Sequence, residues 1–90
     1  MVTAIVLLKV EKDKVHAIAE TLVEIGEITE VYSVAGQYDL AVVLRHKVDE
    51  KIEEVITETI LKIDGITESE TLVAFRVYSR YNLERMFGME

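Results

Sequence analysis

The sequence predicts an α+β domain of the ferredoxin-like βαββαβ plan, in which a four-stranded antiparallel sheet carries two helices on one face. Aliphatic and β-branched runs typical of strands alternate with two segments whose apolar residues recur at helical spacing. The triplet Ile-Thr-Glu at residues 28–30 returns at residues 66–68, each time after a helical segment, which indicates two successive βαβ units. A length of 90 residues leaves room for one domain.

The first half of the chain is predicted to form a strand and then a helix. Residues 2–10 are aliphatic and β-branched, and residues 12–24 follow with helical periodicity. We expect Asp13 to cap the start of this helix, and Gly26 to end it in a left-handed conformation. Its apolar face consists of Val15, Ile18, Ala19, Leu22 and Ile25.

A hairpin and a second helix come next. Strands at residues 28–35 and 40–45 are joined by the short connection 36–39, which favours an antiparallel hairpin. A helix is expected over residues 48–61, with Asp64-Gly65 stopping it. The apolar face of this helix is predicted to contain Val48, Ile52, Val55, Ile56, Thr59 and Ile63.

The last strand is predicted at residues 67–78. We therefore assign residues 1–80 to the domain and residues 81–90 to a C-terminal tail or short helix. An apolar turn within this tail, suited to docking on a neighbour, would consist of Leu83, Met86 and Phe87.

The two central strands suggest self-association. Right-handed crossovers place the first and third strands at the centre of the sheet. A sheet with one wet face should alternate apolar and polar residues, but residues 4–8 and 40–44 are apolar at every position. Both faces of the sheet should therefore be buried, the second by another copy of the chain, most simply in a C2 homodimer.

Composition excludes several classes of function. The net charge is −7, with 10 Lys and Arg against 17 Asp and Glu, so we expect no direct nucleic-acid binding. The apolar run at residues 4–8 is too short to span a membrane, and the protein is expected to be cytoplasmic. There are no cysteines for a thiolate metal site or disulfide, and we expect no cofactor.

The ionisable residues form no recognisable catalytic or metal-binding motif. His16 on the first helix and His46 at the end of the third strand lack the spacing of a triad or a metal site, so we interpret both as surface residues. The acidic residues of the second helix have helix-surface spacing beside Lys47 and Lys51, which is typical of a solvated helix face; they are Glu50, Glu53, Glu54 and Glu58.

The connection Gly36-Gln37-Tyr38-Asp39 is the candidate binding site. Glycine and aspartate are ordinary turn residues, so a simple hairpin loop is one interpretation. In the functional interpretation, Gly36 exposes its backbone N–H to an anionic group and Asp39 offers a carboxylate to a cationic one, as a zwitterionic amino acid requires. Ser69 and Thr71 would add hydroxyl groups from one side of the last strand.

These residues resemble a known family. Val31–Leu40 (VYSVAGQYDL) is similar to the V-x-G-x-Y/F-D signature of the Lrp/AsnC ligand-binding domain. Gly65–Thr71 (GITESET) is similar to the G-V-x-x-s-x-T entry to the last strand of that domain. The resemblance covers residues 2–78, with both motifs in the order and spacing of the family.

The resemblance implies an amino-acid-sensing module, the RAM domain of the feast/famine transcription regulators. Such domains form dimers sheet to sheet, and the dimers assemble into rings, commonly octamers, with effectors bound between dimers near the loop. Carried over, Gly36 and Asp39 would hold the carboxylate and ammonium of an amino acid. Tyr38 would brace the loop beside Gln37, and Ser69 or Thr71 would line the pocket floor.

One departure from the family pattern affects the expected partners. Family regulators carry an N-terminal helix-turn-helix, whereas Met1 lies directly before the first strand. We therefore expect a stand-alone sensor domain, with full-length Lrp/AsnC regulators as candidate partners beside other copies of the chain.

Other functions on the same architecture remain alternatives, because fold does not determine function. The main rival is a dimeric α+β-barrel enzyme of the small monooxygenase or isomerase type, in which His16 or His46 would need a catalytic partner. An ACT-like effector domain fits the Gly-x-Tyr-Asp loop less well. An RNA-recognition domain would need exposed aromatic and basic residues on the central strands.

Overall fold

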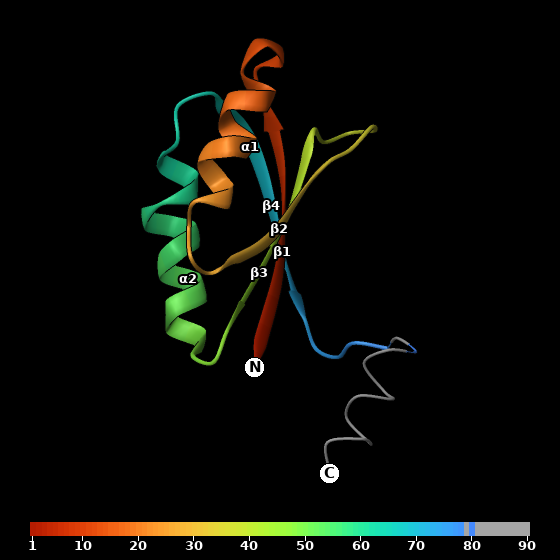
Figure 1. The fold of residues 1–90 in the computed structure, drawn as a ribbon, viewed down its shortest axis with the longest axis vertical. Coiled ribbons are helices and arrows are strands. Elements are labelled where there is room, and N and C mark those ends of the chain that lie inside the picture. Colours follow the sequence, from red (N-terminus) through yellow and green to blue (C-terminus); the bar gives the residue numbers. More distant parts are fainter. Residues whose placement is uncertain (79, 81–90) are drawn as a thin grey trace.

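The computed structural model describes residues 1–78 and residue 80, and it confirms the βαββαβ order (Figure 1). The predicted tail at residues 81–90 lies outside the described residues. The strands and α-helices, in chain order, are β1 (Val2–Val10), α1 (Val15–Val23), β2 (Ile28–Ser33), β3 (Leu40–His46), α2 (Asp49–Glu58) and β4 (Ile66–Ala74). A short 3₁₀ helix, η1 (Lys12–Lys14), precedes α1, and a second one, η2 (Ile60–Lys62), follows α2.

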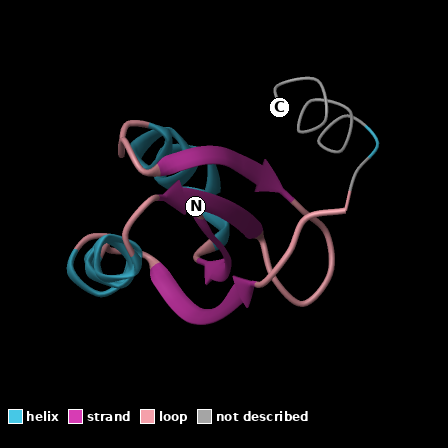
Figure 2. Ribbon diagram, turned by 90° about the horizontal axis from the view of Figure 1, so that it is seen from below, coloured by secondary structure: helices cyan, strands magenta, loops and turns pink. Residues whose placement is uncertain are grey.

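The four strands form one antiparallel sheet in the order β2-β3-β1-β4, so the predicted central position of the first and third strands is confirmed. The register places Leu8 of β1 between Leu40 of β3 and Ser69 of β4. Both helices lie together on one side of the twisted sheet, and residues 75–78 run away from them (Figures 1 and 2).

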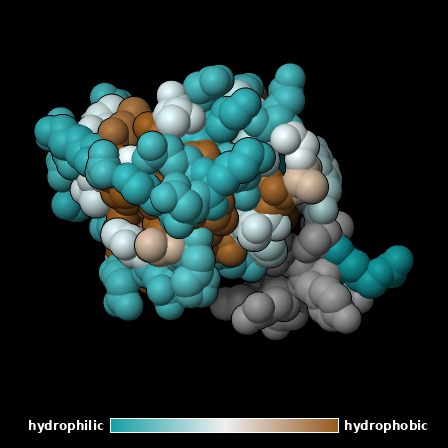
Figure 3. All heavy atoms as spheres, turned by 90° about the horizontal axis from the view of Figure 1, so that it is seen from above, coloured by the Kyte–Doolittle hydropathy of each residue, from teal (hydrophilic) through white to brown (hydrophobic). Residues whose placement is uncertain are grey.

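The hydrophobic core lies between the sheet and the helices. Alternate residues of β1 and β3 point toward the helices and are buried, namely Ala4, Val6, Leu8, Val10, Leu40, Val42 and Leu44. The helix side of the core contains Ile18, Leu22, Ile52, Val55, Ile56 and Ile60. In the view from above, hydrophobic residues (brown) are visible in the middle of the molecule, and hydrophilic residues (teal) surround them (Figure 3). Each fully buried aliphatic side chain contributes about 1.5–3 kcal/mol relative to an exposed one.

The opposite face of the sheet, which we call the open face, is also apolar in its central strands. Ile5 and Leu7 of β1 and Ala41 and Val43 of β3 lie on it and are only partly buried in a single chain. Leu72 of β4 pairs with Ile5 and is 43% exposed. The central strands are apolar at every position of residues 4–8 and 40–44 because one of their faces is buried under the helices and the other forms the apolar open face.

The start and end of α1 differ from the sequence prediction. Asp13 was expected to cap the helix, but it lies within η1, and neither η1 nor α1 has a side-chain capping hydrogen bond. Gly26 was expected to be left-handed, but positive φ angles among the described residues occur at Gly36 and Gly65. Consecutive turns end α1 instead, because Ile25 N–H donates to the Leu22 carbonyl.

The second helix and the strand ends also differ by a few residues. α2 begins at Asp49, and Val48 and Thr59 of its predicted apolar face are exposed. The tighter 3₁₀ turn of η2 then brings Ile60 into the core.

β2 ends at Ser33, where its pairing with β3 ends at Leu40, and β4 ends at Ala74 instead of residue 78. The pairing of β4 with β1 ends where Ala74 meets Thr3, and in the same register residues 76–78 would lie beyond the start of β1. Phe75 is fully exposed in this extension. Within residues 1–78 and 80, no helix is both long enough and apolar enough to cross a membrane.

Candidate functional site

The Gly36–Asp39 loop is fixed to the end of the sheet by backbone hydrogen bonds. Val34 N–H donates to the Asp39 carbonyl at 3.0 Å, and Asp39 N–H donates to the Leu8 carbonyl of β1 at 2.8 Å. Gly36 has a φ of 136°, and no atom of the described residues, apart from Gly36 and its two chain neighbours, lies within 4 Å of the position that a Cβ would occupy. Residues 34–37 are exposed, so the tip of the loop is open to solvent above a fixed base.

Asp39 has a structural contact in addition to its predicted ligand role. Its Oδ2 accepts a hydrogen bond of 2.9 Å from Val10 N–H, in a partly buried setting. β1 extends past the start of β3, and the carboxylate thereby satisfies an amide that β3 does not reach. An ionised carboxylate accepts several hydrogen bonds, so this contact leaves capacity for a ligand ammonium.

Tyr38 reaches across β1 to β4. Its hydroxyl donates to Oε1 of Glu70 at 2.8 Å, and Glu70 pairs with Leu7, which places this bond on the open face. The hydrogen bond to the Glu70 carboxylate stabilises the protonated phenol and raises the pKa of Tyr38 above its ordinary value. This hydrogen bond joins the loop to β4, and no local feature of the sequence identifies Glu70 as the partner of Tyr38.

Ser69 and Thr71 lie on the other face of the sheet. Ser69 pairs with Leu8 and Thr71 with Val6, and both partners point into the helix-facing core. The two hydroxyl groups share one side of β4, as expected from their spacing. Within a single chain, however, the structure groups the loop with Glu70 and keeps Ser69 and Thr71 on the opposite face.

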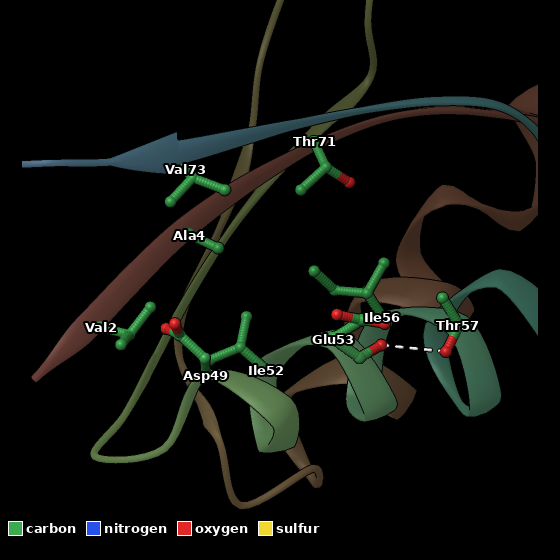
Figure 4. A pocket seen from close by; sticks show the side chains of 9 residues that line it. All are labelled: Val2, Ala4, Asp49, Ile52, Glu53, Ile56, Thr57, Thr71 and Val73. Atoms are coloured by element: carbon green, nitrogen blue, oxygen red, sulfur yellow. Dashed lines mark hydrogen bonds between the residues drawn. The ribbon is translucent and has the colours of Figure 1, made fainter.

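Thr71 instead borders a cleft between α2 and β4. The residues around this cleft are drawn in Figure 4. Its volume is about 410 Å³. Its sheet side is formed by Val2, Ala4, Thr71 and Val73, and its helix side by Asp49, Ile52, Glu53, Ile56 and Thr57. The sequence places these residues in predicted strands or in the predicted second helix, but it contains no signal that a cleft separates the strands from the helix.

The histidines and the acidic residues of α2 make local contacts. His46 Nδ1 accepts from Val48 N–H at 3.0 Å, and His16 Nε2 lies 3.4 Å from Glu20 of the next helical turn. On α2, Lys51 pairs with Glu54 at 3.5 Å. In residues 1–78 and 80, no group of three His, Cys, Asp or Glu side chains is placed to hold a metal ion.

The Tyr38–Glu70 contact can be tested by titration. Glu70→Gln removes the negative acceptor, so the pKa of Tyr38 should fall toward its ordinary value of about 10. NMR titration of ring-labelled tyrosine measures this shift. Tyr32 is the internal control, because its hydroxyl donates to Glu30 at 2.9 Å and its pKa is raised by that separate carboxylate. An unchanged Tyr38 pKa in Glu70→Gln would contradict the contact.

Comparison with known proteins defines the class of this domain. The family profile of the Lrp/AsnC ligand binding domain matches residues 3–83. The HTH-type transcriptional regulator FL11 of Pyrococcus furiosus is 31% identical over 77 residues, which are 86% of this chain and 50% of that protein. The fold and these matches define a ligand-binding domain of the type found in transcription regulators. The chain belongs to the Lrp/AsnC family.

Solved structures share the same fold. TTHA0845 from Thermus thermophilus is 42% identical with a TM-score of 0.82, and the match covers 89% of this chain and 100% of that one. The transcriptional regulator NMB0573 from Neisseria meningitidis, solved as a complex with L-Met, has a TM-score of 0.78 over 88% of this chain and 53% of that one; at 12% identity it shows the fold alone. The chain spans about half the length of the curated relatives it matches.

Proposed function

We propose that this chain is an amino-acid-binding and oligomerisation domain that acts by ligand-dependent assembly, modulating transcription or metabolism without catalysing a reaction. The observation that supports this most directly is the Gly36–Asp39 loop, held at its base by Asp39 and Tyr38 in a domain of a ligand-binding family. The complex of NMB0573 with L-Met supports an amino acid as the class of effector for a domain of this fold.

The loop offers complementary groups for the two ends of an amino acid. The tip around Gly36 and Gln37 is exposed and its backbone N–H groups suit a carboxylate, while Asp39 suits an ammonium. Ser69 and Thr71 lie on the opposite face of the same chain, so in this proposal they complete the pocket only from a neighbouring copy. Effector binding would then favour assembly, because the complete site exists only between chains.

The open face supports a homodimer as the first step of this assembly. It presents apolar residues from three adjacent strands, Ile5, Val43 and Leu72 among them. A stable interface of standard size buries roughly 800 Å² on each partner, an area comparable to one face of a small sheet. Higher rings and mixed assemblies with full-length Lrp/AsnC regulators belong to the same proposal.

The barrel-enzyme alternative is not favoured. Curated relatives are named as transcriptional regulators. Within the described part of the chain, His16 is exposed and pairs with Glu20 at the helix surface, and the imidazole of His46 accepts a hydrogen bond from a backbone amide. We therefore propose a regulatory domain without catalytic residues.

Amino-acid binding can be tested with Asp39 variants. A thermal-shift screen of the twenty amino acids should identify an effector, since a ligand at 100 times its Kd adds about 2.7 kcal/mol to the free energy of unfolding. Asn at position 39 still offers an oxygen to Val10 N–H but lacks the charge, so Asp39→Asn should reduce the ligand-induced shift and leave the melting temperature without ligand nearly unchanged.

Asp39→Ala is the matched control for the structural contact. It leaves Val10 N–H without an acceptor in a partly buried setting, which should lower the free energy of unfolding by about 1–3 kcal/mol with or without ligand. Replacement of both histidines should change neither property. A substrate turned over by the wild type but not by a histidine variant would instead favour the enzyme alternative.

A further inference from the structure

We propose that the cleft between α2 and β4 binds a small amphipathic amine, an ammonium group carried on a short aliphatic body. This site lies at the opposite end of the sheet from the Gly36–Asp39 loop of the same chain, which is near Leu8 and Val10. The proposal does not rest on the amino-acid site, although Thr71 borders this cleft and is also proposed to complete the amino-acid pocket of a neighbouring chain. Three features support the proposal: the uncovered apolar floor, the two carboxylates on one wall, and the charge of the whole chain.

The floor is apolar because β4 is an edge strand that α2 covers incompletely. Val73 pairs with Ala4 and lies on the helix side of the sheet, yet it is 61% exposed while Ala4 is fully buried. Ile52 and Ile56 form the facing wall on α2 (Figure 4). The volume of about 410 Å³ lies within the range of small-molecule sites, so a short aliphatic chain fits the cleft.

The two carboxylates select the charge of the ligand. Asp49 and Glu53 are one helical turn apart and both line the α2 side of the cleft (Figure 4). Among the described residues, the ion pairs of this region join Lys51 to Glu54 and Lys62 to Glu58, and none involves Asp49 or Glu53.

Asp49 lies in the first turn of α2, where the helix dipole also favours an acid. Glu53 lies in the second turn of α2, beyond the reach of the helix dipole, so the dipole does not explain an acidic residue at this position.

The same charges exclude other ligands. A carboxylate or phosphate placed in the cleft would face Asp49 and Glu53 in a chain of net charge −7. A zwitterionic amino acid would bring its carboxylate near the same two groups. The cleft is therefore suited to a cation with an apolar body and unsuited to the effector proposed for the loop.

Methyl-detected NMR of the full chain with n-hexylamine tests the site, using n-hexanoate and n-hexanol as probes with the same body and a different head. Hexylamine should shift the methyl signals of Ile52, Ile56 and Val73. Hexanoate should not, and n-butylamine should bind about fifteenfold more weakly, because it has two methylenes fewer and each buried methylene changes affinity by about fourfold.

Variants then test the two carboxylates. Glu53→Gln alone, and Asp49→Asn with Glu53→Gln, should weaken hexylamine binding by about two- to tenfold, since exposed ion pairs are individually weak. Glu54→Gln is the matched control on the same helix, because Glu54 pairs with Lys51 and does not line the cleft. Asp39→Asn should also leave hexylamine binding unchanged, which separates this site from the loop.

Three results would overturn the proposal: equal binding of hexylamine, hexanol and hexanoate, methyl shifts centred outside the cleft, or unchanged hexylamine affinity in Glu53→Gln. Loss of amino-acid binding in Asp39→Asn with intact hexylamine binding would support both sites independently. If the wild-type chain shows no methyl shifts with hexylamine but keeps its thermal shift with an amino acid, the cleft site alone is overturned.

Discussion

Val43→Asp should convert the protein from a dimer or larger assembly into a folded monomer. Val43 lies on the open face, opposite Ile5 in the register, and is only partly buried in the single chain. A carboxylate at its position remains solvated in the monomer, but it would lose water without a partner charge in a sheet-to-sheet interface. Light scattering at micromolar concentration, together with circular dichroism, measures mass and folding on the same sample.

Val42→Asp is the matched control one residue away. Val42 is fully buried beneath the helices, so an aspartate at its position would place a carboxylate in the core. An unpaired carboxylate in the core costs several kcal/mol, whereas the total free energy of unfolding of a domain is about 5–15 kcal/mol. Val42→Asp should therefore unfold or nearly unfold the chain.

The two variants therefore separate assembly from folding. A wild-type protein that is a well-folded monomer would contradict the dimer proposal, and so would a Val43→Asp variant that keeps the wild-type mass. If mixed assemblies form through the same surface, Val43→Asp should also stop co-purification with a full-length Lrp/AsnC regulator. Recovery of homo-oligomers only, with wild-type chain in excess, would exclude the mixed assemblies.

The sequence predicted the sheet well because its central strands carry a strong signal. Uninterrupted apolar residues at 4–8 and 40–44 identified the two central strands, and the Ile-Thr-Glu repeat identified the order of the elements. Strand ends were less predictable, because they depend on the partner. Residues 75–78 have strand-like side chains, yet β4 ends at Ala74, where its pairing with β1 ends at Thr3.

The sequence predicted the loop of the candidate site but not the distant residues that hold the loop in place. The Gly36–Asp39 loop is continuous in sequence and could be selected from its residue types. Its two supports come from far along the chain: Val10 is 29 residues from Asp39, and Glu70 is 32 residues from Tyr38. Only the register of β4 decides that Glu70, and not Ser69, lies on the face of the loop, since a shift by one residue exchanges the two faces.

The two repeated helix ends show the same limitation at a single residue. Gly26 and Gly65 both precede an Ile-Thr-Glu strand entry, which made them look equivalent. Among these two, only Gly65 has a positive φ, at 105°, and its carbonyl accepts a hydrogen bond of 2.9 Å from Glu11 N–H. Contacts with the segment between β1 and α1 create this difference, and such contacts leave no trace in the local sequence.

Gly65→Ala should therefore be among the most destabilising conservative substitutions in the chain. A Cβ at this position would lie 2.8 Å from Lys14 Cδ and 3.0 Å from Ile18 Cδ1. Ile18 is buried in the core, and Lys14 is held by Glu11 at 3.0 Å and by Asp64 at 2.9 Å, contacts that also raise the pKa of Lys14. Neither side chain can move away without losing contacts.

Backbone strain and crowding act together at this position. A positive φ costs an L-residue about 1–2 kcal/mol, and overpacking adds about 1–3 kcal/mol. The free energy of unfolding should fall by about 2–5 kcal/mol, which lowers the melting temperature by at least about 10 °C in a domain of this size. Thermal unfolding followed by circular dichroism measures both quantities.

Three variants divide that loss into its causes. Gly36→Ala carries positive-φ strain without crowding, so it should lose only about 1–2 kcal/mol, and Gly26→Ala carries neither and should be neutral or slightly stabilising. In a double-mutant cycle, Lys14→Ala should recover part of the Gly65→Ala loss, because it removes the closest colliding atom. If Gly26→Ala and Gly65→Ala lower the free energy of unfolding equally, the two helix ends are equivalent, which would contradict the different backbone angles and contacts of the two glycines.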